Sequence, residues 1–184
     1  MTSTEISYED LQKKLNLLQK YSYTDSLTNL KNRRYLWEKI DSFIDKAIQE
    51  QACISCLMID FDDFKSINDN YGHIEGDKVL EGSCRVIKSF FSRDDIVVRY
   101  GGEEILVLLY NKNLEEANIL AEELRKKMEE LVLDKNIKIT VSIGIYSINN
   151  ILDNEKFELD NIIIEADKAM YQAKKKGKNC VVIP

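Results

Sequence analysis

The chain has 184 residues, of which 44% are hydrophobic, and this size suits one globular domain with a short appendage. Its net charge of −6 argues against a broad electrostatic interaction with DNA, RNA or an anionic membrane, so a nucleotide would need a local cluster of cations and backbone amides. No apolar run approaches the roughly 20 residues that span a bilayer, and the N-terminus has no basic start followed by an apolar stretch. We therefore expect a soluble, cytoplasmic chain that contacts neither nucleic acid nor membrane, with an upstream sensor domain if the natural chain is longer.

Residues 5–22 are predicted to form a helix, with Leu11, Leu15 and Leu18 at the spacing of a heptad stripe. The stripe is too short to make a stable coiled coil alone. Two interpretations stay open: a signalling stalk, or a helix packed on its own domain. We divide the chain into an N-terminal signalling helix at 1–22 and a domain at 23–184.

A break at YTDSLTNLKN separates this helix from the domain, and Asp25, Ser26, Thr28 and Asn32 all offer capping oxygens there. A second helix is expected over 33–49. Its apolar face is formed by Leu36, Ile40, Phe43 and Ala47.

The rest of the chain alternates between strand and helix patterns. The run at 54–60 predicts a buried strand because it is short and nearly continuously apolar, and it stops at Asp60. Gly101 and Gly102 lie between two further strand patterns and predict a two-residue hairpin turn with positive φ. We expect helices at 62–70, 75–91, 114–131 and 160–175, and strands at 96–100, 103–110, 137–148 and 179–184. This order predicts an α/β sandwich, a mostly antiparallel central sheet with helices covering its faces.

The chain has four cysteines, and two of them, Cys53 and Cys56, form a C-x-x-C pattern that is typical of zinc or redox sites. On the predicted strand, however, residues three apart point to opposite faces, which is unfavourable for chelation. We therefore expect all four, including Cys84 and Cys180, to be small buried hydrophobic residues.

Carboxylates are predicted to gather where two strands end. Asp60 ends the first strand, and Glu103 and Glu104 begin the strand after the glycines. If the two strands are neighbours, these side chains meet at one edge of the sheet and form a hard-oxygen site suited to Mg²⁺ or Mn²⁺ and shared with substrate phosphates. The alternative is an ordinary hairpin whose acidic pair lies in water.

The segment from Ile59 to Asp77 carries groups that suit a nucleotide. Lys65, near the start of a helix, can meet a phosphate. Asp77 can accept hydrogen bonds from N1–H and the amine of guanine, while the amide of Asn68 reads its acceptor atoms; adenine lacks the N1–H. The alternative is that these are capping and turn residues. His73, the only histidine, is of a kind more often structural than catalytic.

A lysine-rich segment at 173–178 is either a solvated helix end or a clamp for a triphosphate.

Four motifs, taken together and in this order, change the interpretation of the segments described above. They are DSLTNLKNRR (25–34), DFDDFKSINDNYGHIEGD (60–77), RYGGEEI (99–105) and ADKAMYQAKKKGKN (166–179). Together they resemble the GGDEF domain, the catalytic module of diguanylate cyclases, over about residues 23–183.

The resemblance implies a palm-like fold akin to nucleotidyl cyclases, in which a homodimer condenses two GTP molecules into cyclic di-GMP and two pyrophosphates. The ribose 3′-OH would attack the α-phosphate with the help of a metal, Mg²⁺ or Mn²⁺. The implied metal ligands are Asp60, the carbonyl of Phe61 and Glu103, with Glu104 for a second ion, and one glutamate would help to deprotonate the 3′-OH. Phosphate contacts are implied for Lys65, Lys174 and Lys178, guanine contacts for Asn68 and Asp77, and other substrate-binding positions for His73, Gly101 and Gly102.

The sequence departs from the family pattern in three places. Ile105 stands where phenylalanine is usual, and Lys178 stands where arginine is commoner. The inhibitory product site, R-x-x-D, reads S-R-D-D, with Ser92 in place of the arginine and Asp95 kept, and Arg93 is one position off. We therefore predict weak product inhibition. Two alternatives remain: a degenerate, non-catalytic module that binds GTP or a partner as a relay, and a cyclase with a mixed or adenine product, which Asp77 argues against.

Overall fold

The computed structural model describes residues 7–149 and 159–184. The helices are α1 (Tyr8–Tyr23), α2 (Arg33–Gln49), α3 (Phe64–Tyr71), α4 (His73–Phe90), α5 (Leu114–Glu130) and α6 (Leu159–Lys175). The strands are β1 (Lys31–Asn32), β2 (Ile54–Phe61), β3 (Ile96–Arg99), β4 (Glu104–Tyr110), β5 (Val141–Ile148) and β6 (Val181–Val182). The predicted succession of elements is confirmed, and the structure adds the short β1 inside the segment that the sequence indicated as a break.

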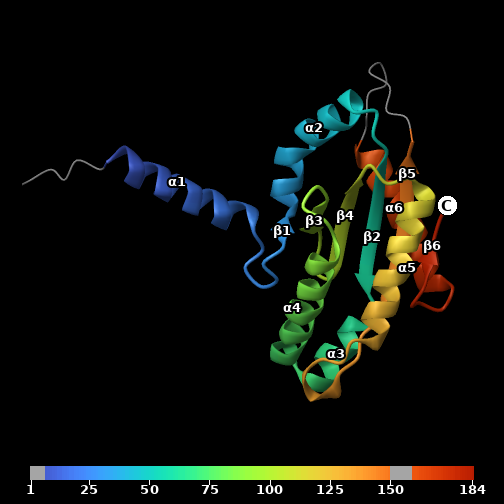
Figure 1. Ribbon diagram of the computed structural model, residues 1–184. Coiled ribbons are helices and arrows are strands. Elements are labelled where there is room, and N and C mark those ends of the chain that lie inside the picture. Colours follow the sequence, from blue (N-terminus) through green and yellow to red (C-terminus); the bar gives the residue numbers. More distant parts are fainter. Residues whose placement is uncertain (1–6, 150–158) are drawn as a thin grey trace, which may run out of the picture.

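The strands form one six-stranded sheet in the order β1-β3-β4-β2-β5-β6 (Figure 1). The three central pairings, β3–β4, β4–β2 and β2–β5, are antiparallel, while β1 and β6 add parallel strands at the two edges. The predicted α/β sandwich with a mostly antiparallel sheet is therefore confirmed. β2 lies between β4 and β5, so whatever stands at its end is close to both neighbours.

Helices cover both faces of the sheet, and the two faces form separate cores. Leu57 and Ile59 of β2 pack in one core with residues of α3, α4 and α5. Cys56 and Met58 pack in the other with residues of α2 and α6. Because side chains alternate along a strand, Asp60 belongs to the same face as Met58, which is the side of α6. Burial on both faces also explains why the sequence of β2 is almost continuously apolar.

A glycine in β5 allows α6 to lie directly on the sheet. A Cβ atom at Gly144 would stand 2.1 Å from both the carbonyl oxygen of Ala166 and the amide nitrogen of Met170, which are backbone atoms of α6. Any side chain here would therefore push the helix away. The close approach brings the C-terminal turn of α6, which carries Lys174, to the end of β2.

The turn between β3 and β4 differs from the expected two-residue hairpin. The backbone N–H groups of Tyr100 and Gly101 both donate to the carbonyl of Glu104, at 2.8 and 3.2 Å, so two residues face one as in a β-bulge. Neither Gly101 nor Gly102 has a positive φ, and that expectation was wrong because the longer, bulged loop needs no left-handed residue. A Cβ at Gly101 would lie 2.1 Å from Oε2 of Glu104, so a side chain there would displace this carboxylate, while the flank of Gly102 is open.

Several element boundaries also differ from the prediction. α3 begins at Phe64 rather than 62, because Asp63 has a left-handed φ of 55°. β5 begins at Val141 rather than 137, after a 3-10 turn at Asp134–Asn136. α4 begins at His73 rather than 75, directly after the turn that follows α3.

The cysteines are only partly as expected. Cys56 and Cys84 are buried in the two cores, and burial raises the pKa of both thiols, that of Cys84 to about 12. Cys53 and Cys180 are only half-buried, so the prediction of full burial was wrong for them. Both lie outside the strands, Cys53 just before β2 and Cys180 just before β6, where the sheet no longer covers them.

Helix α1 projects away from the sheet (Figure 1). Leu11 and Leu18 are 58% and 65% exposed, which favours a stalk over a helix packed on its own domain. The side chain of Leu15 lies outside the described part of the structure. The base of α1 is fixed by Ser22, which accepts hydrogen bonds from Asn32 and Arg34 at 2.9 Å each. Within residues 7–149 and 159–184, no helix has both the length and the apolar character needed to cross a bilayer.

Candidate functional site

The acidic residues predicted at two strand ends do come together. In the antiparallel pairing of β2 with β4, Asp60 stands directly opposite Glu104. Alternation places both on the α6 side of the sheet. Glu103 immediately precedes β4, so all three carboxylates lie where the central strands β2 and β4 meet at one end of the sheet.

The surroundings of these three carboxylates disfavour negative charge. Burial raises the pKa of Asp60, and nearby Asp167 of α6 adds to the rise. Burial also raises the pKa of Glu103 and of Glu104, and in both cases the charge of Asp60 contributes. No sequence pattern pointed to Asp167, which comes close to these carboxylates because α6 lies against the sheet. A cation at this end of the sheet would favour the charged forms of the carboxylates.

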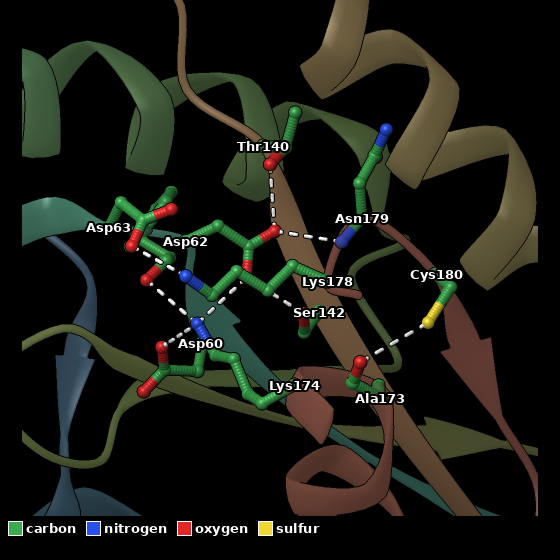
Figure 2. A network of polar contacts seen from close by, with 11 residues as sticks. Asp60, Asp62, Asp63, Thr140, Ser142, Ala173, Lys174, Lys178, Asn179 and Cys180 are labelled. Carbon is green, nitrogen blue, oxygen red and sulfur yellow. Dashed lines mark hydrogen bonds and ion pairs between the residues drawn. The ribbon is translucent and has the colours of Figure 1, made fainter. Parts of the chain in front are cut away.

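One lysine already supplies a positive charge here. Nζ of Lys174 contacts Oδ1 of Asp60, the carbonyl oxygen of Phe61 at 2.9 Å and Oδ1 of Asp62 at 2.8 Å (Figure 2). Burial opposes the charged form of Lys174, but its contacts with Asp60 and Asp62 outweigh burial and raise its pKa. Lys174 is thus held by the residues implied as metal ligands rather than turned toward solvent.

Asp62 is the centre of this network, and the sequence assigned it no role. Its side chain is only 3% exposed, and its oxygens accept from Thr140 Oγ1 and Ser142 Oγ at 2.7 Å each, and from the backbone N–H of Asn179 at 3.0 Å (Figure 2). Burial raises its pKa, but the hydrogen bonds from Lys174, Thr140 and Ser142 outweigh burial and lower it. Asp62 therefore joins the end of β2, the start of β5 and the turn after α6.

The two other predicted phosphate contacts differ from Lys174. Lys178 pairs with Asp63 through Nζ and Oδ1 at 2.5 Å, in the turn after α6, where it has a positive φ of 65°. Lys65 is exposed on the first turn of α3, and in the described part of the chain its ammonium has no ion-pair partner. Lys174 and Lys178 are thus already held by carboxylates, whereas the ammonium of Lys65 is exposed.

The predicted guanine contacts lie on the pair of helices α3 and α4. Asn68 packs against Gly76, where a Cβ would stand 1.9 Å from Oδ1 of Asn68, so glycine is required for this contact. Asp77 follows Gly76 and is exposed. His73 is exposed at the start of α4, and among residues 7–149 and 159–184 neither His73 nor Asp77 has a side-chain hydrogen-bond partner.

Arg99 connects the loop at 100–103, which carries Glu103 and is called the glutamate loop, to the segment after α1. The sequence did not predict this connection. Its guanidinium donates twice to the carbonyl of Gly102, at 3.0 and 2.6 Å, and once to Oδ1 of Asp25 at 2.9 Å. Asp25 also accepts from the backbone N–H and hydroxyl of Thr28, at 2.8 and 2.7 Å. Of the four capping candidates, Asn32 caps α2 by accepting from Tyr35, while Asp25 holds this loop.

The segment of the degraded product motif is closed on itself. Oδ2 of Asp95 accepts from the amide and hydroxyl of Ser92 at 2.9 and 2.7 Å, and Oδ1 accepts from the amide of Tyr110 at 2.9 Å. Arg93 is exposed beside this turn. Both oxygens of Asp95 are therefore engaged, which supports the prediction of weak product inhibition.

The donor set at the end of β2 suits a divalent cation. Carboxylates and a backbone carbonyl are the oxygen ligands that Mg²⁺ and Mn²⁺ prefer, and raised pKa values mark Asp60, Glu103 and Glu104 as sites where a cation is favourable. Within residues 7–149 and 159–184, no group of three His, Cys, Asp or Glu side chains is placed so that the three together could hold a metal ion. Asp60 and Glu104 are a pair, and Mg²⁺ commonly takes one or two carboxylates and completes its shell with water and substrate phosphates.

Comparisons with known proteins agree with this geometry. The family model described as "Diguanylate cyclase, GGDEF domain" matches residues 22–180. "Diguanylate cyclase A" of Treponema denticola is 40% identical over 166 residues, which cover 87% of this chain and 44% of that protein. Among the other curated relatives the chain spans between 35% and 54% of their length, so it corresponds to about half of them or less.

Solved structures show the same architecture. The coiled coil and GGDEF domain of DgcB from Caulobacter crescentus, solved with c-di-GMP, superimposes with a TM-score of 0.85 at 27% identity, covering 96% of this chain and 93% of that one. The active GGEEF domain of a diguanylate cyclase from Vibrio cholerae superimposes with a TM-score of 0.73 at 34% identity, covering 83% of this chain and 96% of that one.

Proposed function

The chain belongs to the GGDEF family of diguanylate cyclase domains, and we propose from this that it condenses two GTP molecules into cyclic di-GMP and two pyrophosphates. The observation that carries the proposal is the pairing of Asp60 with Glu104, which brings the carboxylates of two strands together on one side of the sheet. We also propose a cytoplasmic location for this reaction.

A divalent cation, Mg²⁺ or Mn²⁺, would be held by Asp60, the carbonyl of Phe61 and Glu103, with Glu104 available to a second ion. When bound, it supplies positive charge that polarises the α-phosphate and offsets the charge of the triphosphate. The raised pKa values of the three carboxylates support this assignment, because a bound cation would stabilise the charged forms that burial disfavours.

The protein's own cations and bases do the rest. Lys65, Lys174 and Lys178 would hold the phosphates, and Gly101 and Gly102 would let the substrate approach the loop, since the flank of Gly102 is open. Glu103 or Glu104 would accept the proton of the 3′-OH in its charged form, which a nearby cation favours. The 3′-oxygen would then bond to the α-phosphorus of the other GTP as the bond to the β-phosphate oxygen breaks and pyrophosphate leaves.

The base would be selected on α3 and α4. The carboxylate of Asp77 would accept from N1–H and the 2-amino group of guanine, Asn68 would read its acceptor edge, and His73 would flank the substrate. Exposure supports these roles, because Asp77 and His73 are open to a ligand. Adenine would leave the Asp77 carboxylate without a donor, which disfavours ATP.

Two domains must face each other, because each would hold one GTP and the product needs two. The exposed stripe of α1, with Leu11 and Leu18, supports a homodimer joined through a stalk at 1–22. Such a stalk would also connect the domain at 23–184 to an upstream sensor in a longer natural chain. Deleting 1–22 should lower activity at low protein concentration but much less at high concentration, as measured by product formation across a dilution series.

The central experiment is to incubate the purified chain with Mg²⁺ and GTP, ATP or both, and to resolve the products by mass. Cyclic di-GMP from GTP alone is the expected result. A mixed or adenine product would overturn the guanine assignment. Saturable GTP binding without turnover would replace the enzyme with a non-catalytic relay.

A further inference from the structure

The ammonium of Lys174 is fully engaged at the end of β2. Its three contacts are with Asp60, the carbonyl of Phe61 and Asp62, which are three consecutive residues (Figure 2). A lysine ammonium has three hydrogens to donate, so three oxygens satisfy it. In this arrangement Lys174 has no hydrogen left for a phosphate.

Two of the three groups that hold Lys174, the Asp60 carboxylate and the Phe61 carbonyl, are assigned above to a divalent cation. A divalent cation held by Asp60 and the carbonyl of Phe61 would come close to the ammonium, and the two positive charges would repel each other. We propose that Lys174 and a divalent cation bind the end of β2 in mutual exclusion, and that the ammonium moves from Asp60 and Phe61 to the triphosphate when metal and nucleotide enter together. The nucleotide half of this inference rests on the proposed function.

Asp62 sets how far Lys174 moves. Its carboxylate stays in place without the lysine, because Thr140, Ser142 and the amide of Asn179 also hold it. Its side chain is only 3% exposed, so losing the ammonium altogether would leave a nearly buried charge short of a partner. Lys174 therefore releases Asp60 and Phe61 but keeps Asp62, which acts as a tether and is a positioning residue.

This exclusion couples the metal to the nucleotide. A metal that arrives alone must displace the ammonium and gives it no new acceptor. A metal that arrives with a triphosphate brings phosphate oxygens that accept the hydrogen bonds Lys174 gives up. Each ligand therefore raises the affinity for the other.

The test measures binding of Mn²⁺ alone to the full chain, from the electron paramagnetic resonance signal of free Mn²⁺, with no nucleotide present. Lys174→Met removes the charge at nearly constant length and should tighten Mn²⁺ binding about tenfold or more relative to the unmodified chain. Lys174→Arg keeps the charge and should bind Mn²⁺ as weakly as the unmodified chain. Lys175→Met is the matched control, since Lys175 is the next residue of α6, is exposed and lies over the ring of Tyr171 instead.

An unchanged or weaker Mn²⁺ affinity in folded Lys174→Met would overturn the exclusion. If that variant does not fold, Lys174→Gln replaces it, because its amide can still donate to Asp62 while the charge is gone, and the same two outcomes apply. The readout needs no turnover. Tighter Mn²⁺ binding in a chain that makes no cyclic di-GMP would support the exclusion and refute only the cyclase, and an active cyclase without that gain would refute only the exclusion.

Discussion

At the end of β2 the polar side chains bind one another, whereas His73 and Asp77 on α4 face solvent. Asp60, Asp62 and Lys174 form one network of ion pairs and hydrogen bonds. Asp77 and His73 are exposed, and within the described ranges no side-chain hydrogen bond engages them. The first region must therefore serve the fold as well as any ligand, while the second can serve a ligand alone. Substitutions in the two regions should separate along this line.

The largest effect is expected at Glu103, which lies beside Asp60 and Glu104 and has no side-chain hydrogen bond or ion pair within residues 7–149 and 159–184. Glu103→Gln keeps shape and removes the charge, so the rate of cyclic di-GMP formation should fall by about 10³-fold or more, since a metal ligand and a candidate base are lost together. Thermal stability should stay within about 1–2 °C, because no hydrogen bond among the described residues is broken.

Glu123→Gln is the control for Glu103→Gln. Glu123 is exposed on α5, far along the chain from the strand ends, and its substitution should change neither rate nor stability. An active Glu103→Gln enzyme would remove the glutamate loop from the mechanism.

Asp62→Asn should mainly damage the fold. Its carboxylate is nearly buried and accepts four hydrogen bonds, so losing its charge should lower the free energy of unfolding by about 2 kcal/mol and the melting temperature by roughly 4–8 °C. Calorimetry at pH 7 measures this difference between the two chains.

The pH dependence of that difference has a definite sign. The pKa of Asp62 is lowered in the fold, so its stabilisation is present above the unfolded value of about 3.9 and is lost as the pH falls through the lower folded value. The difference between the parent chain and Asp62→Asn should therefore be largest near neutral pH and shrink below about pH 4. A difference independent of pH would show that the charge of Asp62 is not what stabilises the network.

Asp77→Asn should affect the substrate and spare the fold. The exposed carboxylate has no hydrogen-bond partner in the described part of the chain, so the melting temperature should stay within about 1 °C. The loss of one charged hydrogen-bond acceptor should lower kcat/KM for GTP about tenfold.

Inosine triphosphate sharpens the assignment of Asp77, because hypoxanthine keeps N1–H and lacks the 2-amino group. The preference of the parent enzyme for GTP over this analogue should fall toward one in Asp77→Asn. Asp69→Asn, an exposed acid on α3, is the matched control and should keep the preference. An unaltered preference in Asp77→Asn would assign the reading of guanine to other residues.

The sequence predicted the parts of this site that depend on local pattern. The apolar run of β2 and its stop at Asp60 indicated a buried strand with an acidic end, and the following motif placed Asn68 and Asp77 on the helices. Alternation along the strands then follows from geometry, which is why Asp60 and Glu104 share a face.

What the sequence could not predict depends on contacts between distant segments. Asp62 is held by residues 78, 80 and 117 positions away, and no local spacing marks them as partners. The same holds for Arg99 and Asp25, which are 74 positions apart. The D-F-D-D run at 60–63 was the one available signal, since a second acid directly after a buried strand needs a reason to be there.

The smallest effect is expected at Glu104. Its negative charge suits a cation, but the same charge is unfavourable in the fold without one. Burial raises its pKa, and the charges of Asp60 and Asp167 add to the rise, so the ionised side chain destabilises the fold. For an acid with a raised folded pKa, stability falls as the pH rises from the unfolded value through the folded one. Glu104→Gln removes this penalty and should raise the melting temperature by about 1 °C at pH 8 and not at all near pH 4, where the glutamate is largely protonated. Paired scans at the two pH values measure it, and a lower melting temperature at pH 8 would mean that Glu104 stabilises the chain instead.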